Sequence, residues 1–186
     1  SDAEEVEESD NLALNKTIKV SAEYTNPNAG PQLGSMMVDG DLQSKWCALE
    51  DASIGTHWAI LDLGEVKQIG YYRLHHAGTI GEAEHNTMAY QLQYLPGVTE
   101  TDWETIETDD LAWEDMDNVT DNTATVTSKA FDTPIETRYV RLLVNKPAPS
   151  NGAVRLHELE LYEEVQEELP FYEKQDILNA EVLMSA

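Results

Sequence analysis

The chain has 186 residues, of which 41% are hydrophobic and 8% aromatic, and this apolar content excludes intrinsic disorder over the whole length. Its 36 acidic residues outnumber 11 basic ones, and the resulting net charge of −25 repels the phosphates of nucleic acids and anionic lipid headgroups. We therefore expect neither nucleic acid nor membrane lipid as a partner, and the length suits one domain with loose ends.

The first ten residues, SDAEEVEESD, are acidic and poor in apolar side chains, which predicts a linker over residues 1–10. This start does not resemble a signal peptide, and no run of about 18 apolar residues predicts a membrane span. We expect an excised fragment of a longer protein. Cys47 is the only cysteine, so no disulfide can form within the chain, which argues against an animal extracellular domain and leaves bacterial secretion open.

From residue 11 to residue 164, apolar and polar residues mostly alternate between turn signals rich in Gly, Pro, Asn and Asp. The candidate strands are residues 17–22, 57–63, 68–75, 89–95, 123–130, 138–145 and 154–162. Seven or eight short strands without helical periods predict an all-β fold, an antiparallel β-sandwich or jelly roll with a binding site among its end loops. Residues 165–186 are predicted to be a linker or the start of a following domain, with a short amphipathic helix over residues 173–184.

A turn rich in oxygen-bearing side chains follows the first candidate strand. Asp39, Asp41 and Ser44 lie within six residues around Gly40, and calcium prefers oxygen ligands from such a turn. An EF-hand would place Asp39, Asp41 and Glu50 at loop positions one, three and twelve. It fails because Ser44 stands where the loop needs glycine and because the flanks do not show helical periodicity. An ordinary acidic turn remains the alternative to a calcium site.

Five segments resemble the discoidin or coagulation factor 5/8 C-terminal domain superfamily between residues 11 and 162. They are Asn11-Leu12-Ala13, Val38-Asp39-Gly40-Asp41 with Trp46, Trp58 to Gly64, Arg138 to Leu142, and Leu156 to Tyr162. Within that superfamily, His75 to Gly78, Gly81-Glu82 and Asn86-Thr87 are similar to carbohydrate-binding module family 32. The resemblance implies a galactose-binding-domain-like jelly roll with a structural calcium ion. It implies calcium ligands from the side chains of Asp39, Asp41, Ser44 and Glu158 and from the backbone carbonyls of Met36 and His157.

The loop between residues 75 and 89 contains the side chains expected to bind a sugar. His76, Glu82 and Asn86 supply donors and acceptors for ring hydroxyls, and Tyr24 is the candidate aromatic platform for the sugar ring. The alternatives are a structural histidine at a strand end, a solvated loop in which Asn86 caps a turn, and a packed Tyr24. Cys47 stands where galactose-binding members of the family often have histidine.

The chain contains no sequence pattern of an enzyme. It has no nucleophile elbow, zinc-binding His-Glu-x-x-His segment, P-loop or dinucleotide fingerprint, and strand alternation should point His75 and His76 to opposite faces. Together with this absence, the resemblance to carbohydrate-binding module family 32 implies a non-catalytic accessory module of a larger secreted or cell-surface bacterial protein, such as a glycoside hydrolase. It would target its covalently attached neighbours to glycans with terminal galactose, GalNAc, GlcNAc or a similar unit. The alternative is a structural or protein-docking sandwich with a decayed sugar site.

Overall fold

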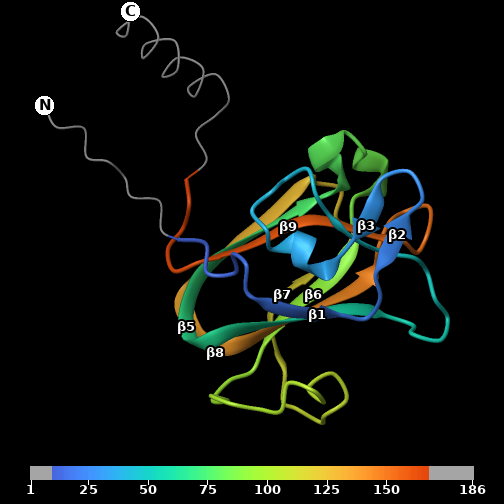
Figure 1. Cartoon of the computed structure of the whole chain (residues 1–186). Helices are drawn as coiled ribbons and strands as arrows, with labels where there is room; N and C mark the ends of the chain where they lie inside the picture. Colours follow the sequence, from blue (N-terminus) through green and yellow to red (C-terminus); the bar gives the residue numbers. More distant parts are fainter. Residues whose placement is uncertain (1–9, 168–186) are drawn as a thin grey trace, which may run out of the picture.

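The computed structural model describes residues 10–167 as an all-β domain with short 3-10 helices (Figure 1). The strands are β1 (Thr17–Val20), β2 (Tyr24–Asn26), β3 (Gly30–Gln32), β4 (Trp46–Ala48), β5 (His57–His76), β6 (Ala89–Tyr94), β7 (Glu114–Val119), β8 (Val126–Lys146) and β9 (Val154–Tyr162). The 3-10 helices are η1 (Gly34–Met37), η2 (Ala77–Ile80) and η3 (Ala83–His85). None of the described helices is long and apolar enough to cross a membrane.

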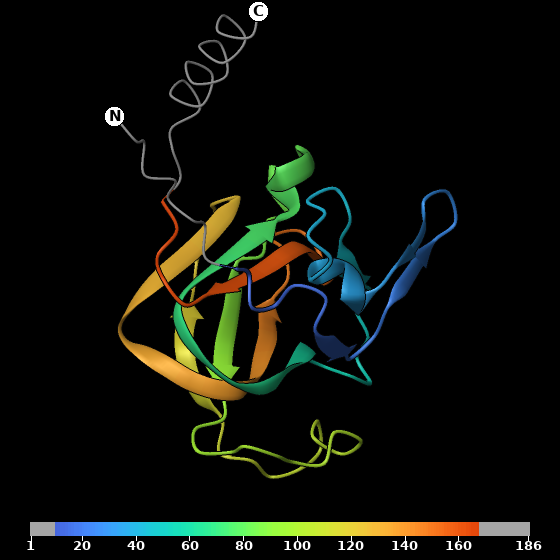
Figure 2. The ribbon, with the colours of Figure 1, turned by 60° about the vertical axis from the view of Figure 1, so that its left-hand side comes forward.

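One antiparallel sheet forms both layers of the sandwich because its two longest strands bend. The order is β4-β9-β5-β8-β6-β7, with β1 also paired to β5, while β2 and β3 form a separate hairpin. Residues 59–62 of β5 pair with β1, and residues 57–62 pair with residues 139–144 of β8. After a register break between Asp62 and Lys67, residues 67–75 pair with residues 126–137 of β8, and residues 71–76 pair with β9. Figure 2 shows β5 and β8 as curved ribbons that pass from one layer to the other.

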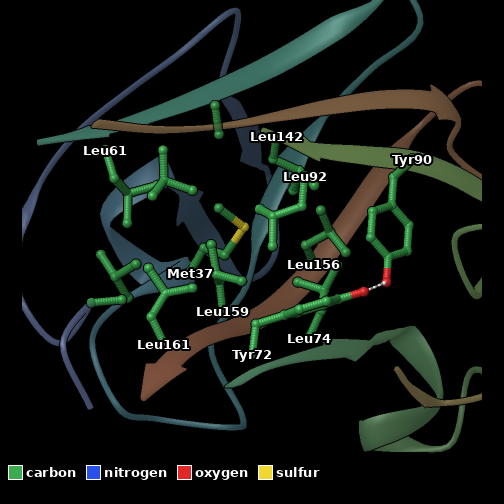
Figure 3. Close-up of a cluster of buried hydrophobic side chains, with 14 of the residues drawn as sticks. Met37, Leu61, Tyr72, Leu74, Tyr90, Leu92, Leu142, Leu156, Leu159 and Leu161 are labelled. Carbon is green, nitrogen blue, oxygen red and sulfur yellow. Dashed lines mark hydrogen bonds between the residues drawn. The ribbon is translucent and has the colours of Figure 1, made fainter. Parts of the chain in front are cut away.

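We call the part with β1, β6, β7, residues 57–62 and residues 139–146 the first layer. The part with β4, β9, residues 67–76 and residues 126–137 is the second layer. Their facing side chains form the main core, which includes Met37, Leu61, Tyr72, Leu74, Leu92, Leu142 and Leu161 (Figure 3). Trp46 is fully buried in this core, and its indole Nε1 donates a hydrogen bond to the Ala22 carbonyl at 2.8 Å. Leu156, Leu159 and Leu161 of β9 all enter the core, and the alternation of the strand breaks between Leu156 and Leu159, beside the register shift at His75 and His76.

The outer face of the first layer carries a second, smaller core. Residues 95–113 fold back over this face, and their Leu95 and Ile106 pack against Ile60 and Tyr139. Partly buried Trp58, Trp103 and Trp113 surround this cluster. In Figure 1 the segment is the yellow-green loop below the sheet.

The predicted all-β sandwich is confirmed, with three differences in its strands. Candidates 57–63 and 68–75 are halves of β5, and candidates 123–130 and 138–145 fall in β8, which begins at Val126. The short strands β2, β3 and β4 and the acidic strand β7 were not predicted. The predicted domain limits stay predictions. Residues 1–9 and 168–186, including the predicted helix over 173–184, lie outside the described residues.

Candidate functional site

The aspartate turn places several oxygen atoms around one hydroxyl group. Ser44 Oγ lies 2.6 Å from Asp39 Oδ2, 3.1 Å from the Asp41 carbonyl oxygen and 3.4 Å from the Met36 carbonyl oxygen. Gly40 permits the turn with a φ of 79°, a left-handed conformation that disfavours other residues. The backbone carbonyl of Asp41 thus faces this group. The Asp41 carboxylate, which was the predicted calcium ligand, instead accepts a hydrogen bond from the Gln43 amide at 2.8 Å.

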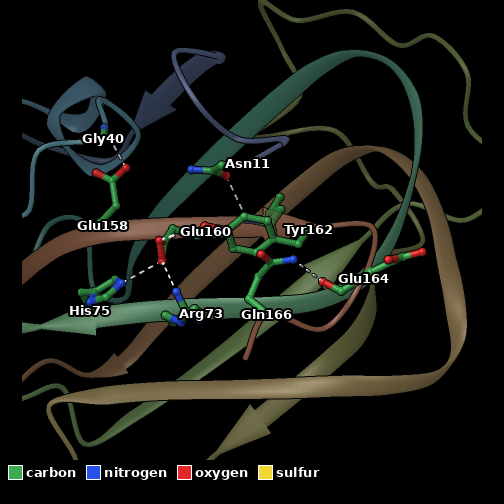
Figure 4. Close-up of polar contacts among 10 residues, drawn as sticks. Asn11, Gly40, Arg73, His75, Glu158, Glu160, Tyr162, Glu164 and Gln166 are labelled. Carbon is green, nitrogen blue, oxygen red and sulfur yellow. Dashed lines mark hydrogen bonds and ion pairs between the residues drawn. The ribbon is translucent and has the colours of Figure 1, made fainter. Parts of the chain in front are cut away.

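Glu158 on β9 joins this turn from the other end of the chain. Its Oε2 accepts a hydrogen bond from the Gly40 amide at 2.8 Å (Figure 4), whereas its buried Oε1 has no hydrogen-bond partner within residues 10–167. Burial, and then the negative charges of Asp39 and Glu160, raise the pKa of Glu158 to about 9.

These oxygen atoms fit a hard divalent cation. The described residues contain no group of three or more His, Cys, Asp and Glu side chains that could hold a metal ion. The set instead combines the carboxylates of Asp39 and Glu158 with the Ser44 hydroxyl and backbone carbonyls, all of them oxygen donors of the kind that calcium prefers. His157 binds the Leu42 carbonyl through its ring Nδ1 at 2.8 Å, and the predicted role of its own carbonyl stays a prediction.

The structure corrects the predicted contact between His76 and a sugar. His76 is fully buried, and its Nε2 lies 2.9 Å from the Thr127 hydroxyl. A register shift between His75 and His76 accompanies this orientation, and His75 faces outward to Glu160 at 2.8 Å (Figure 4). The prediction that the two rings point to opposite faces is therefore confirmed. His76 is the structural histidine of the alternative interpretation, because no ligand can reach its ring in this conformation.

Asn86 is also a structural residue. It is 2% exposed, and its Oδ1 accepts a hydrogen bond from the Gly78 amide at 2.7 Å while its Nδ2 donates to the Thr123 carbonyl at 3.2 Å. These bonds hold the η2–η3 segment against the loop before β8. The predicted contact of Asn86 with a sugar is corrected, since both ends of its amide are already engaged inside the fold.

Glu82 is the predicted sugar-binding residue of this loop that stays accessible. Its side chain is 41% exposed, and its Oε2 lies 3.9 Å from Nζ of Lys45, which sequence reasoning missed. Tyr24 is half-buried on β2, and Figure 2 shows the β2–β3 hairpin standing apart from the η2–η3 segment. The structure therefore brings Glu82 to Lys45, but it does not place Tyr24 beside them.

Several buried polar atoms near the η2–η3 segment have no hydrogen-bond partner in the described part of the chain. They are His76 Nδ1, Thr79 Oγ1, His85 Nδ1, Thr87 Oγ1 and, on β9, His157 Nε2. The register of β5 and β9 pairs His76 with Leu156, which places the neighbouring His157 near this segment. Buried polar groups normally pair with protein, water or ligand, so the polar groups at this end of the sandwich are only partly satisfied by the described residues.

The fold and these motifs agree with the comparison to known proteins. The F5/8 type C domain family matches residues 17–159. The chain belongs to the F5/8 type C domain family. No curated protein sequence matches this F5/8 type C domain significantly.

Several solved structures share the fold of this F5/8 type C domain. The family 32 carbohydrate-binding module of Streptococcus pneumoniae EndoD matches with a TM-score of 0.63 and 22% identity, over 83% of this chain and 100% of that module. Chitosan-binding module 2 of a Paenibacillus sp. IK-5 chitosanase/glucanase, solved with chitotriose, has a TM-score of 0.60 and 23% identity over 82% and 99% of the two chains. The family 32 module of C. perfringens NanJ, solved with galactose, has a TM-score of 0.59 and 14% identity over 80% and 94%.

Two further polar residues lie at the loop end of this F5/8 type C domain. Arg155 stands opposite Cys47 in the β4–β9 pair, and its Nη1 donates to Asn151 Oδ1 at 3.2 Å. The loop around Asn151 packs closely on Glu50, because a Cβ added at Gly152 would lie 2.8 Å from that side chain. Burial raises the pKa of the Cys47 thiol, so this residue stays a buried neutral group.

Proposed function

We propose that this domain is a non-catalytic carbohydrate-binding module whose sugar site lies at the loop end of the sandwich. The observation that carries the proposal is the partly exposed pair formed by Glu82, between η2 and η3, and Lys45, directly before β4. A carboxylate accepts hydrogen bonds from two vicinal hydroxyls, and an ammonium donates to hydroxyl oxygens. The shared fold with modules that bind galactose or chitotriose supports this choice of ligand class.

The proposed ligand is a terminal galactose, GalNAc, GlcNAc or a similar unit. The net charge of −25 opposes acidic glycans and tolerates neutral or amino sugars. Arg155 and Asn151 would extend the site toward β9. His76 and Asn86 would not contact the sugar, but their hydrogen bonds would hold the η2–η3 segment, and with it Glu82, in position.

We further propose that the aspartate turn holds a structural calcium ion. Asp39, Ser44 and Glu158 would bind it together with the carbonyls of Met36 and Asp41. When bound, calcium supplies the positive charge that offsets two neighbouring carboxylates in a partly buried place. The residues that bind the ion would connect an early turn of the chain to β9, the last strand of the sheet.

The proposed setting is a secreted or cell-surface bacterial protein with covalently attached neighbouring domains. The bacterial modules that share the fold support this setting, as does the absence of a cysteine partner for Cys47. The module would keep an attached enzyme or surface protein near its glycan, since a tethered binding unit raises the local concentration of its neighbours.

The test is a glycan array followed by titration calorimetry on the full chain with galactose, GalNAc and GlcNAc. We expect binding of at least one sugar and a loss of about tenfold or more in affinity for the double variant K45A/E82Q, since a hydrogen bond to a charged group contributes about 1.5–3 kcal/mol. The matched control is K67A/E65Q, which removes another Lys–Glu pair at 2.7 Å near the bend of β5. The proposal would be wrong if no glycan bound at millimolar concentration.

A second candidate function is a structural or protein-docking sandwich with a decayed sugar site. The burial of both His76 and Asn86 favours it, because two of the predicted sugar contacts are closed off. A chain that binds no glycan but forms a stable complex with the neighbouring domain of its parent protein would support this function instead.

A further inference from the structure

The tryptophans of the chain are unevenly distributed over its surface. The sequence has 4 tryptophans, and Trp46 is fully buried in the main core. The other three, Trp58, Trp103 and Trp113, are all half-buried and all pack around the small core on the outer face of the first layer. This face therefore carries three partly buried indole rings.

A row of polar side chains runs across the same face beside these rings. The register places Ile60, Arg141, Gln93 and Asp115 opposite one another on the neighbouring strands β5, β8, β6 and β7. Arg141 Nε donates to Gln93 Oε1 at 2.8 Å, and Gln93 Nε2 donates to Asp115 Oδ1 at 3.0 Å. The guanidinium carbon of Arg141 also lies 4.6 Å from the centre of the Trp113 ring. These contacts fix the orientation of each side chain in the row.

A second row extends the polar surface toward the end of β8. Gln91 Nε2 donates to Asp115 Oδ1 at 3.1 Å, and Asn145 Nδ2 donates to Gln91 Oε1 at 3.1 Å. Arg141 uses one of its five N–H donors in hydrogen bonds to the described residues, and Asn145 and Asp115 are exposed. The rows are thus held rigidly but keep donors and acceptors that face solvent.

We propose that this outer face, formed by Trp58, Trp113, Gln91, Arg141 and Asn145, is a second glycan-binding surface for a chain of several neutral sugar units. The partly exposed edges of the Trp58 and Trp113 rings can contact the apolar face of a pyranose, and pre-oriented amide, carboxylate and guanidinium groups match its hydroxyls. The ordering of these side chains before binding lowers the entropy cost of binding. The inference rests on the proposed function only for its ligand class.

The composition of the face favours a glycan over a protein. The exposed large hydrophobic residues of the described chain, Leu14, Leu42, Leu49, Val66, Ile80 and Val165, all lie on other segments. A protein interface would need such an apolar centre, whereas sugars need aromatic rings flanked by polar groups. The face from Trp58 on β5 to Asp115 on β7 spans three strand spacings, about 14 Å, which exceeds a single sugar ring.

The test compares neutral hexasaccharides with monosaccharides on the full chain. Cellohexaose, xylohexaose, mannohexaose and N-acetylchitohexaose are the probes, and titration calorimetry is the measurement. We expect at least one hexasaccharide to bind, with an affinity about tenfold lower for Q91A/N145A and for Trp113→Leu. Binding of galactose, GalNAc or GlcNAc should stay unchanged in these variants, whereas K45A/E82Q should show the reverse pattern. Gln68→Ala on the second layer is the control.

A measurement on the unmodified protein keeps the test independent of variant stability. In NMR spectra, the indole N–H signals of Trp58 and Trp113 should shift with the bound hexasaccharide, while the signal of buried Trp46 stays in place. The inference is overturned if Q91A/N145A keeps full affinity or if these signals do not move at saturation. It is also overturned if monosaccharides bind and no hexasaccharide binds. Hexasaccharide binding without monosaccharide binding would refute the loop-end site alone.

Discussion

His76 lies at one end of a chain of hydrogen bonds inside the core. The Thr127 hydroxyl links His76 to Tyr90, whose hydroxyl lies 2.6 Å from that of Tyr72 (Figure 3), and Tyr72 donates to Asp117 at 2.5 Å. Burial, with the nearby charges of His75 and His157, lowers the pKa of His76 to about 3. Between about pH 6.5 and pH 3, the ring is therefore neutral in the folded protein, whereas the same histidine is protonated in the unfolded chain.

This shift predicts acid sensitivity. A histidine with a lowered folded-state pKa contributes stability that is present above pH 6.5 and is lost as the pH falls toward 3, at about 1.4 kcal/mol per pH unit. We expect His76→Gln to be less stable than the wild type at pH 7.5 but to lose less free energy of unfolding between pH 6.5 and 4. Urea denaturation over this range is the measurement, with His85→Gln as the control. Equal pH slopes for His76→Gln and the wild type would contradict the assignment.

Residue-level prediction from the sequence succeeded where local geometry determines the role of a side chain. Asp39 and Ser44 converge because the turn around Gly40 brings them together within six residues. The roles of His76 and Asn86 depended instead on the register shift in β5 and on Thr123, 37 residues from Asn86. Neither long-range contact has a local sequence signal. Arg155 and Lys45 were missed for the same reason, because only the folded sheet brings them to the loop end.

At the level of elements, the bend of β5 decides how the sandwich closes. The segment Asp62-Leu63-Gly64-Glu65 looks like a turn between two strands, and Gly64 has a φ of 86°. The backbone bends here but stays in the sheet, and Arg138 on β8 braces it through hydrogen bonds to both Asp62 oxygens at 2.8 and 3.0 Å. Alternation alone cannot separate such a bend from a turn. The strand β7 was not predicted because its sequence is mostly acidic and polar and has a single buried residue, Met116, so no apolar alternation is visible.

The core strand β8 yields a direct test of this packing. Leu142 is fully buried between the layers, where it pairs with Ala59 on β5 and Leu92 on β6. Leu142→Ala should lower the free energy of unfolding by about 2–5 kcal/mol, because a cavity adds to the lost burial. Leu49→Ala carries the same substitution at a residue that is 51% exposed, and should change it by less than about 1 kcal/mol. Equal effects in chemical denaturation would contradict the described core.

At the scale of the whole molecule, the two proposed glycan surfaces use different parts of the same sandwich. The loop end is built from connections between strands, whereas the outer face of the first layer is built from strands whose side chains are fixed by register. Residues 95–113 cover only part of that face through Ile106 and Trp103. A glycan chain and a terminal sugar could therefore be bound by one domain, which would raise the avidity for branched or repeated ligands without a second module.

The proposed calcium ion also acts at the scale of the whole molecule. It would join the turn around Gly40 to the strand that contains Glu158, and these two residues are 118 positions apart in the sequence. An ion that binds only the folded chain stabilises it by about 4 kcal/mol when its free concentration is a thousand times its dissociation constant. We expect calcium to raise the melting temperature and a chelator to lower it. Asp39→Ala should abolish this dependence, whereas the control Asp132→Ala, at an exposed residue of β8, should keep it. Sugar binding by Asp39→Ala should weaken only indirectly below its lowered melting temperature, since Lys45 follows the aspartate turn but Glu82 lies on a different loop. A wild-type melting temperature indifferent to calcium and chelator would refute the proposed site.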